Sequence, residues 1–221
     1  MNKKVITAII VWCGFLLIQP VCNFGFFNGP EGDGYTLAAL IRPAVFDDYP
    51  LYKPLWRGFV AFVMIAVTMS FICPVRQIWS ELGLGMNGFL NGWVIGTAFC
   101  LPMFITNAIA GEFVFSWENL FFSALWPGFF EEITFRAFPF GPLYRKCKWN
   151  FFLAIIIPTV AFALGHLYQS HDLMSALLTM AVTGLGSLLF AWIYVEWNFN
   201  LWVAIAMHAM MDAAWVLFPV S

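Results

Sequence analysis

The stretch FFEEITFRAF, residues 129–138, places Glu131, Glu132 and Arg136 inside an otherwise apolar run. The rest of the 221-residue chain is similarly apolar, since 62% of its residues are hydrophobic and only 10% are charged. An ordinary globular domain has roughly 45–50% apolar and about 25% charged residues. The composition therefore predicts an integral membrane protein, in which charges inside an apolar run need a specific explanation.

Long apolar stretches recur along the whole sequence. A membrane-spanning helix needs about 20 mostly apolar residues. We therefore expect an all-α fold, a polytopic membrane helical bundle with about seven transmembrane helices. The expected spans lie near residues 5–22, 56–75, 89–111, 119–141, 151–168, 172–197 and 199–218. A polar segment rich in Gly, Pro, Asp and Tyr, residues 29–53, is expected to form an external loop.

The charged residues outside the spans indicate the orientation of the chain. Lys3 and Lys4 precede the first span, which lacks a small-x-small cleavage site, so we interpret it as a retained helix with a cytoplasmic N-terminus. This topology puts Arg76 and the cluster RKCK, residues 145–148, on the same side, as the positive-inside rule expects. The expected location is a prokaryotic inner membrane.

Composition also limits the partners. The net charge of −2 comes without a basic patch, which excludes nucleic acid as a predicted partner and leaves the lipid bilayer and a peptide or membrane-protein substrate. The sequence does not set an oligomeric state. The five cysteines form no CxxC pair and are expected to be small core residues. Small residues at helical spacing are expected to let helices pack closely, namely Gly92, Gly96, Gly184, Ser187 and Ala191.

A few ionisable side chains remain within or near the apolar spans. An ionisable group near the bilayer centre costs roughly 2.5 to 3.5 kcal/mol on insertion scales, so such groups should face a protein interior and have partners. A single Glu-Arg pair is more often a helix-packing salt bridge than a site, and a lone buried His is usually a satisfied core residue. The distribution of six such groups over three spans instead predicts one polar pocket, formed by Glu131, Glu132, Arg136, His166, His208 and Asp212.

Helical spacing suggests how these groups pair. Glu132 and Arg136 are four residues apart and share a helix face, so they can neutralise each other. Glu131 points about 100° away and is left as the candidate for chemistry. Asp212 lies one turn beyond His208 and can accept its ring N–H. His171, in a short loop, is expected to be a solvated surface residue.

Two adjacent acids and two histidines from different helices suit the activation of water for hydrolysis. The sequence has no GxSxG motif, no Ser-Lys pairing and no HExxH helix. Two alternatives remain open. A divalent metal such as zinc, held by Glu131, His166 and His208, could lower the pKa of a bound water. Alternatively, Glu131 could act directly as a general base without any cofactor, while a histidine stabilises the oxyanion.

Three motifs carry a family resemblance. EEITFR matches EExxxR, FALGH matches FxxxH and HAMMD matches Hxxx(N/D), in this order on successive late helices. The sequence resembles the CPBP family (CAAX protease and bacteriocin-processing, or Abi) of intramembrane endopeptidases over about residues 119–217. The resemblance divides the chain into N-terminal transmembrane helices with an external loop, residues 1–118, and a catalytic helical core, residues 119–221.

The resemblance implies a role for each motif residue. Glu131 would activate the attacking water, Glu132 and Arg136 would support it, and the remaining residues would complete the site. The family is often described as metal-dependent, although a glutamate mechanism is favoured for its prenyl-protein endopeptidases. This chain has Ala137 where glycine is frequent and Asp212 where asparagine is commoner.

The function expected from these observations is a membrane-embedded endopeptidase, glutamate- or metal-dependent, that cleaves a membrane-associated protein or peptide. The alternative is a non-enzymatic membrane protein, either an ion carrier that uses the same groups as a relay or a bacteriocin immunity or scaffold protein. A carrier would be expected to place polar residues deep in several other spans. The second and third spans contain no deep charge, which favours the enzyme.

Overall fold

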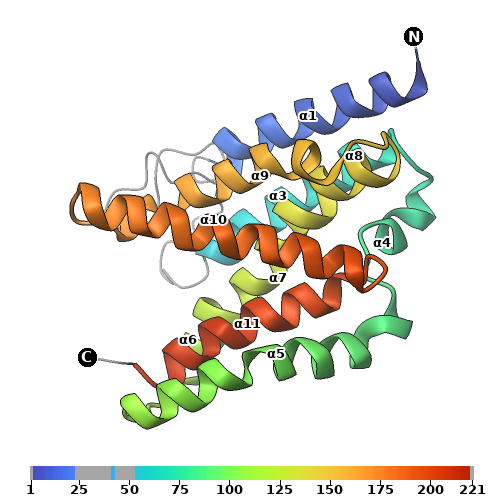
Figure 1. Cartoon of the computed structure of the whole chain (residues 1–221). Coiled ribbons are helices and arrows are strands. Elements are labelled where there is room, and N and C mark those ends of the chain that lie inside the picture. Colours follow the sequence, from blue (N-terminus) through green and yellow to red (C-terminus); the bar gives the residue numbers. More distant parts are fainter. Residues whose placement is uncertain (1, 23–40, 43–52, 220–221) are drawn as a thin grey trace. The chain divides into compact units, whose positions relative to one another are not determined.

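Helices are the regular secondary structure in the part of the protein whose structure is described. The computed structural model describes residues 2–22, 41–42 and 53–219, and within these ranges it contains helices and no strand (Figure 1). This confirms the all-α prediction. The external loop expected at residues 29–53 lies, except for residues 41, 42 and 53, outside the described residues.

Each of the seven expected spans coincides with a helical segment. Two π-helical segments, η5 (Phe121–Leu125) and η6 (Ile133–Phe140), join three short α-helices into one continuous helical stretch. The α-helices are α1 (Lys3–Cys22), α3 (Lys53–Ser70), α4 (Ile78–Glu81), α5 (Phe89–Ala110), α6 (Trp117–Leu120), α7 (Trp126–Glu132), α8 (Gly141–Arg145), α9 (Phe151–Gly165), α10 (Leu173–Glu196) and α11 (Leu201–Leu217).

Several of these helices have the length and composition of membrane spans. Four segments of the described chain qualify, namely Lys3–Cys22, Val75–Ala110, Phe151–Gln169 and Leu173–Glu196. Two shorter apolar helices cover Leu55–Ser70 and Leu201–Leu217. Large apolar side chains such as Ile109, Leu173 and Phe152 are mostly exposed. Exposed apolar helices of this length are typical of an integral membrane protein.

The chain divides into two compact units. The first unit comprises Met1–Ile78 and Thr134–Ala191, and the second comprises Trp79–Ile133 and Trp192–Ser221. Each unit thus combines an earlier and a later part of the sequence. The sequence division at residue 118 stays a prediction.

In the first unit, small residues allow close helix packing. A Cβ added at Gly14 of α1 would lie 2.5 Å from Thr68 Cγ2 of α3. Between α9 and α10, the buried hydroxyls of Thr159 and Ser187 are 3.0 Å apart and form a hydrogen bond. Ala191 is fully buried, whereas a Cβ at Gly184 would meet only one atom, at 3.9 Å. Close packing is therefore found around Ser187 rather than Gly184.

In the second unit, α11 is the central helix. Every residue of its first half, from Leu201 to Ala209, is buried. A Cβ added at Gly92 of α5 would lie 2.5 Å from Trp202 Cβ, and one added at Gly96 would lie 2.6 Å from Val203 O. The absence of side chains there lets α5 run directly along α11 (Figure 1), which confirms the packing role predicted for both glycines.

The N-terminus of α11 is fixed by one side chain. Asn200 caps the helix by accepting a hydrogen bond from Trp202 N. Its amide nitrogen also donates to Gly88 O, at 2.9 Å. Because Gly88 directly precedes α5, Asn200 sets the position of α11 along α5.

The cysteines differ in one case from the prediction. Cys22, Cys73, Cys100 and Cys147 are buried and all five cysteines are free, as expected. Cys13 is exposed, so its assignment to the core is wrong. It lies on the outward face of α1, where apolar character is required by the membrane rather than by a protein core.

We expect Gly96→Ala to destabilise the protein. Its new Cβ would lie 2.6 Å from the backbone oxygen of Val203, and such overpacking costs about 1 to 3 kcal/mol. Gly186→Ala is the matched control, because a Cβ there meets nothing within 4 Å and alanine favours a helix. Thermal unfolding in detergent should show a lower midpoint for Gly96→Ala only, and an equal effect of both substitutions would contradict the packing of α5 on α11.

Candidate active site

Two helices of the second unit bring polar side chains together in an apolar surrounding. Glu131 and Glu132 end α7, while His208 and Asp212 lie on α11. A Cβ added at Gly128 of α7 would lie 2.8 Å from Ala209 N. This glycine therefore permits a close approach of α7 to α11 one residue from His208. Local packing, rather than the polar residues alone, places the two glutamates beside the imidazole.

The shortest polar contact of this cluster is fully internal. His208 Nδ1 lies 2.7 Å from Glu132 Oε1. The side chain of Glu132 is 0% exposed and that of His208 is 8% exposed. A carboxylate oxygen at this distance accepts the Nδ1 proton. The bond fixes the ring orientation and leaves Nε2 to face the rest of the cluster.

The other ring nitrogen faces two partly exposed acidic side chains. His208 Nε2 lies 3.4 Å from Asp212 Oδ2 and 3.8 Å from Glu131 Oε2. The side chains of Asp212 and Glu131 are 31% and 32% exposed. Glu131 Oε2 itself is buried and has no hydrogen-bond partner within the described part of the chain. The imidazole therefore lies between one fully buried glutamate and two acidic side chains that are partly exposed.

Asp212 lies near a ring nitrogen of His208, as the spacing predicts, at 3.4 Å from Nε2. The shorter contact, which the spacing did not predict, is made at Nδ1 by Glu132 from a different helix. The two nitrogens of an imidazole point to different sides of the ring. For this reason two adjacent glutamates, which diverge by about 100° on a helix, can both lie near one histidine.

The backbone directly after the two glutamates is a π-helix. η6 begins at Ile133, contains Arg136 and continues through Pro139, which has no N–H to donate. In a π-helix the hydrogen bonds run from i to i+5, so α-helical spacing no longer defines which residues share a face. The shared face expected for Glu132 and Arg136 rested on α-helical geometry, and their mutual neutralisation stays a prediction. Single π-turns inside α-helices are frequent at functional sites.

Arg136 belongs to the first unit and is fully buried there. Its guanidinium carbon lies 4.2 Å from the ring centre of Phe162 and 5.2 Å from that of Phe190. A planar guanidinium between two aromatic faces gains cation–π energy, which is largest in a desolvated site. Phe162 of the FxxxH motif thus makes a cation–π contact with Arg136 of the EExxxR motif.

His166 also belongs to the first unit and follows the last turn of α9. Its Nδ1 lies 2.8 Å from the backbone oxygen of Phe162, and its ring lies 4.5 Å from the Phe162 ring. The four-residue spacing of FxxxH therefore lets one phenylalanine hold both the histidine and Arg136. Phe190 could not be found from the sequence, because it is one of 26 phenylalanines and belongs to no motif.

The structure thus places the six predicted residues in two groups. Glu131, Glu132, His208 and Asp212 lie together in the second unit. Arg136 and His166 lie around Phe162 in the first unit. The convergence of both groups on one pocket stays a prediction. His171 is exposed in its loop, as expected.

The residues of the predicted metal set lie in both units. Within the described ranges, no group of three or more His, Cys, Asp or Glu side chains is arranged to hold a metal ion. The Nδ1 of His208 is occupied by Glu132. Because His166 belongs to the first unit and Glu131 and His208 belong to the second, this metal set stays a prediction, and no step is derived through a metal.

Comparison with known proteins supports the interpretation of these motifs. Residues 113–214 match the family model described as type II CAAX prenyl endopeptidase Rce1-like. This region of the chain is therefore similar to the Rce1-like family. This match confirms the resemblance to CAAX proteases, and the matched region includes all six predicted site residues. No curated protein and no solved structure matches the chain significantly.

The Rce1-like family is a family of proteases, so the match supports a peptidase with a peptide or protein substrate. Together with the apolar helices, it supports an integral membrane protein. The region shared with the family begins at residue 113, just before α6.

We expect Arg136→Lys to be destabilising although it keeps the charge. A lysine lacks the flat guanidinium that lies between the Phe162 and Phe190 rings, and loss of a desolvated cation–π contact costs on the order of 2 kcal/mol. Arg76→Lys is the matched control, since Arg76 is exposed. The measurement is the midpoint of thermal unfolding in detergent, which should fall for Arg136→Lys and not for Arg76→Lys. An equal fall in both variants, or no fall in either, would contradict the stacking.

Proposed function

We propose that the protein is an intramembrane endopeptidase that hydrolyses a peptide bond in a membrane-associated protein or peptide by means of a water activated by Glu131. The observation that supports this most strongly is the contact set of His208. One ring nitrogen is held by a buried glutamate, and the other faces Glu131, whose side chain is partly exposed and whose nearer oxygen has no hydrogen-bond partner among the described residues. Such a set can hold a water and a carbonyl group next to each other.

Glu131 is the proposed general base. Its side chain is 32% exposed, and a water hydrogen-bonded to the carboxylate would pass a proton to it as the water oxygen attacks the carbonyl carbon. The attack gives a tetrahedral intermediate with a negatively charged oxygen. When the C–N bond breaks, the same proton passes from Glu131 to the leaving nitrogen. The products are a carboxylic acid, which then loses its proton to solvent, and an amine, and the glutamate returns to its initial state.

His208 is the proposed stabiliser of the oxyanion. Its Nδ1 bond to Glu132 prevents rotation of the ring, so an Nε2–H can point at the developing charge without reorganisation. Asp212, 3.4 Å from Nε2, would help to hold this proton on the ring. By resemblance, Arg136 and His166 complete the site. Their positions relative to the carbonyl group are part of the proposal.

The substrate class follows from the family description. Rce1-like proteins are described as CAAX prenyl endopeptidases, so a lipid-modified C-terminal tail is the first substrate to test. Unprenylated membrane peptides, including bacteriocin precursors and signal peptides, are the second. We propose that the N-terminus is cytoplasmic and that the chain resides in a prokaryotic inner membrane, because Lys3, Lys4, Arg76 and the cluster at residues 145–148 then share one side.

The test is peptide cleavage by the purified protein in detergent. We expect Glu131→Gln to lower the cleavage rate of an accepted peptide by about 10²- to 10⁴-fold, because glutamine is isosteric but cannot take a proton. His208→Ala should lower it by about 10²- to 10³-fold, as expected for loss of an oxyanion donor. His171→Ala, in an exposed loop, is the control and should leave the rate unchanged. Unchanged cleavage by Glu131→Gln would overturn the assignment.

The same samples decide the question of a metal. Elemental analysis for zinc and other divalent metals is combined with cleavage in the presence of a chelator. A stoichiometric metal together with loss of cleavage would favour the alternative with a metal-bound water. Cleavage by metal-free protein would favour Glu131 as the direct base.

A further inference from the structure

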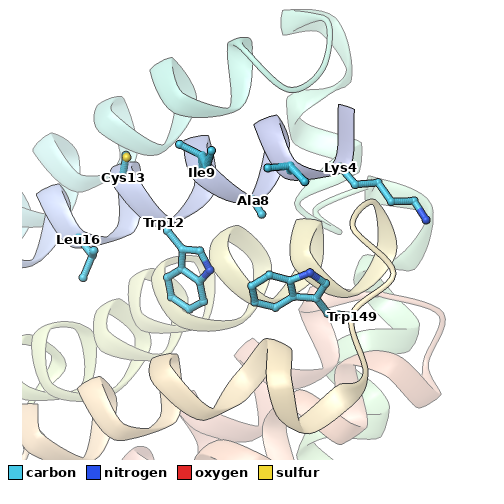
Figure 2. A pocket seen from close by; sticks show the side chains of 8 residues that line it. Lys4, Ala8, Ile9, Trp12, Cys13, Leu16 and Trp149 are labelled. Atoms are coloured by element: carbon cyan, nitrogen blue, oxygen red, sulfur yellow. The ribbon is translucent and has the colours of Figure 1, made fainter. Parts of the chain in front are cut away.

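The first unit contains an apolar groove that the proposed reaction does not use. The groove has a volume of about 460 Å³ and runs along the outward face of α1 beside the turn that precedes α9 (Figure 2). Val5 and Ile9 are about half exposed, and Leu16 is 59% exposed. The residues that line the groove are Lys4, Val5, Ala8, Ile9, Trp12, Cys13, Leu16 and Trp149.

Two tryptophans form one wall of the groove. The rings of Trp12 and Trp149 have centroids 6.2 Å apart, and both lie beside the same space in Figure 2. Trp149 is held there by its turn, in which its backbone N–H donates to Leu143 O at 3.2 Å and Lys148 has a φ of 61°. A left-handed conformation is costly for lysine, so the surrounding contacts must enforce it. Tryptophan is enriched at the headgroup level of membranes.

The end of the groove next to these rings is positively charged. Lys4 lines the groove. Two exposed lysines are sequence neighbours of residues that line it, because Lys3 precedes Lys4 and Lys148 precedes Trp149. The Cys147 thiol donates to Lys4 O at 3.3 Å, which ties the turn to the start of α1. Burial raises the pKa of Cys147, so the thiol keeps the proton that it donates. Asp172 is the one acid among the described residues of this unit, and it lies beyond the opposite end of α9.

The length of the groove corresponds to one leaflet. From Lys4 to Leu16, α1 rises about 18 Å at 1.5 Å per residue. One leaflet of a bilayer has a hydrocarbon depth of about 15 Å. The groove therefore has Lys4 at one end and apolar side chains from there to Leu16, with the two tryptophans between these ends, which suits the charged and the apolar parts of a phospholipid.

We propose that this groove binds an anionic glycerophospholipid, with its phosphate between Lys4 and Lys148, its glycerol region beside Trp12 and Trp149, and one acyl chain along Ile9 and Leu16. Charge complementarity selects the occupant, because the cationic end has no acid in the described unit with which to pair. A zwitterionic lipid would fill the trough equally well but would gain less at the cationic end. The site is independent of the proposed peptidase reaction.

The test is lipid binding to the detergent-purified full chain, measured by native mass spectrometry. Phosphatidylglycerol and phosphatidylcholine with identical acyl chains are compared. Each cation near a phosphate is worth about a fivefold change in affinity. We expect phosphatidylglycerol to bind at least about fivefold more tightly, and Lys4→Ala and Lys148→Asn each to remove about fivefold of this affinity. Asparagine is chosen at residue 148 because it tolerates a left-handed backbone.

Matched controls separate this site from general effects. Arg76→Ala removes an exposed cation of the same unit and should leave phosphatidylglycerol affinity unchanged. The double substitution of Trp12 and Trp149 by alanine should weaken both lipids, whereas Trp192→Ala, with 47% of that residue exposed, should weaken neither.

Four outcomes would overturn the proposal. The first is equal affinity for the two lipids, and the second is an equal loss of phosphatidylglycerol affinity in Arg76→Ala and Lys4→Ala. The third is one-for-one displacement of phosphatidylglycerol by a prenylated peptide. The fourth is a protein dimer that is lost on substitution of Trp149. The third would make the groove a substrate site, and the fourth would make it an interface between two copies.

Discussion

The hydrogen bond between His208 on α11 and Glu132 on α7 is the constraint on which the candidate site depends. Both side chains are buried, and the burial of either one in an apolar bundle would be costly without the hydrogen bond to the other. The bond requires α7 and α11 to approach closely, which Gly128 permits on one side. Gly92 and Gly96 permit the same approach of α5 to α11. Three glycines and one hydrogen bond therefore fix the helix that carries the histidine.

This arrangement gives the two adjacent glutamates different surroundings. Glu132 is inaccessible and accepts the hydrogen bond of the inner ring nitrogen. Glu131 is about one-third exposed and lies near the outer nitrogen. In the proposed reaction Glu132 would support the imidazole and Glu131 would be the base. This division would explain a doublet of acids in an apolar run.

The sequence predicted the helices and the proximity of four polar residues, Glu131, Glu132, His208 and Asp212, but not most of the contacts that these and the other two make. Hydropathy located all seven helical stretches, because length and apolarity alone decide which segments can span a membrane. The cost of burying charge identified the six polar residues. The π-helix at η6, the selection of Glu132 as the partner of His208 and the stacking of Arg136 on Phe190 depend on packing between distant segments. Local spacing carries no signal for them. The exposure of Cys13 was missed because apolar residues facing lipid and those facing a core look alike in sequence.

The most direct measurement of the central contact is a double-mutant cycle of Glu132→Leu and His208→Leu, in which unfolding free energies in detergent are compared for the two single variants and the double variant. We expect a coupling energy between about 1 and 3 kcal/mol, because either substitution alone leaves a buried partner unsatisfied and the second then costs little more. Additivity to within about 0.5 kcal/mol would show that the two side chains do not interact, and the site would then lack its central contact.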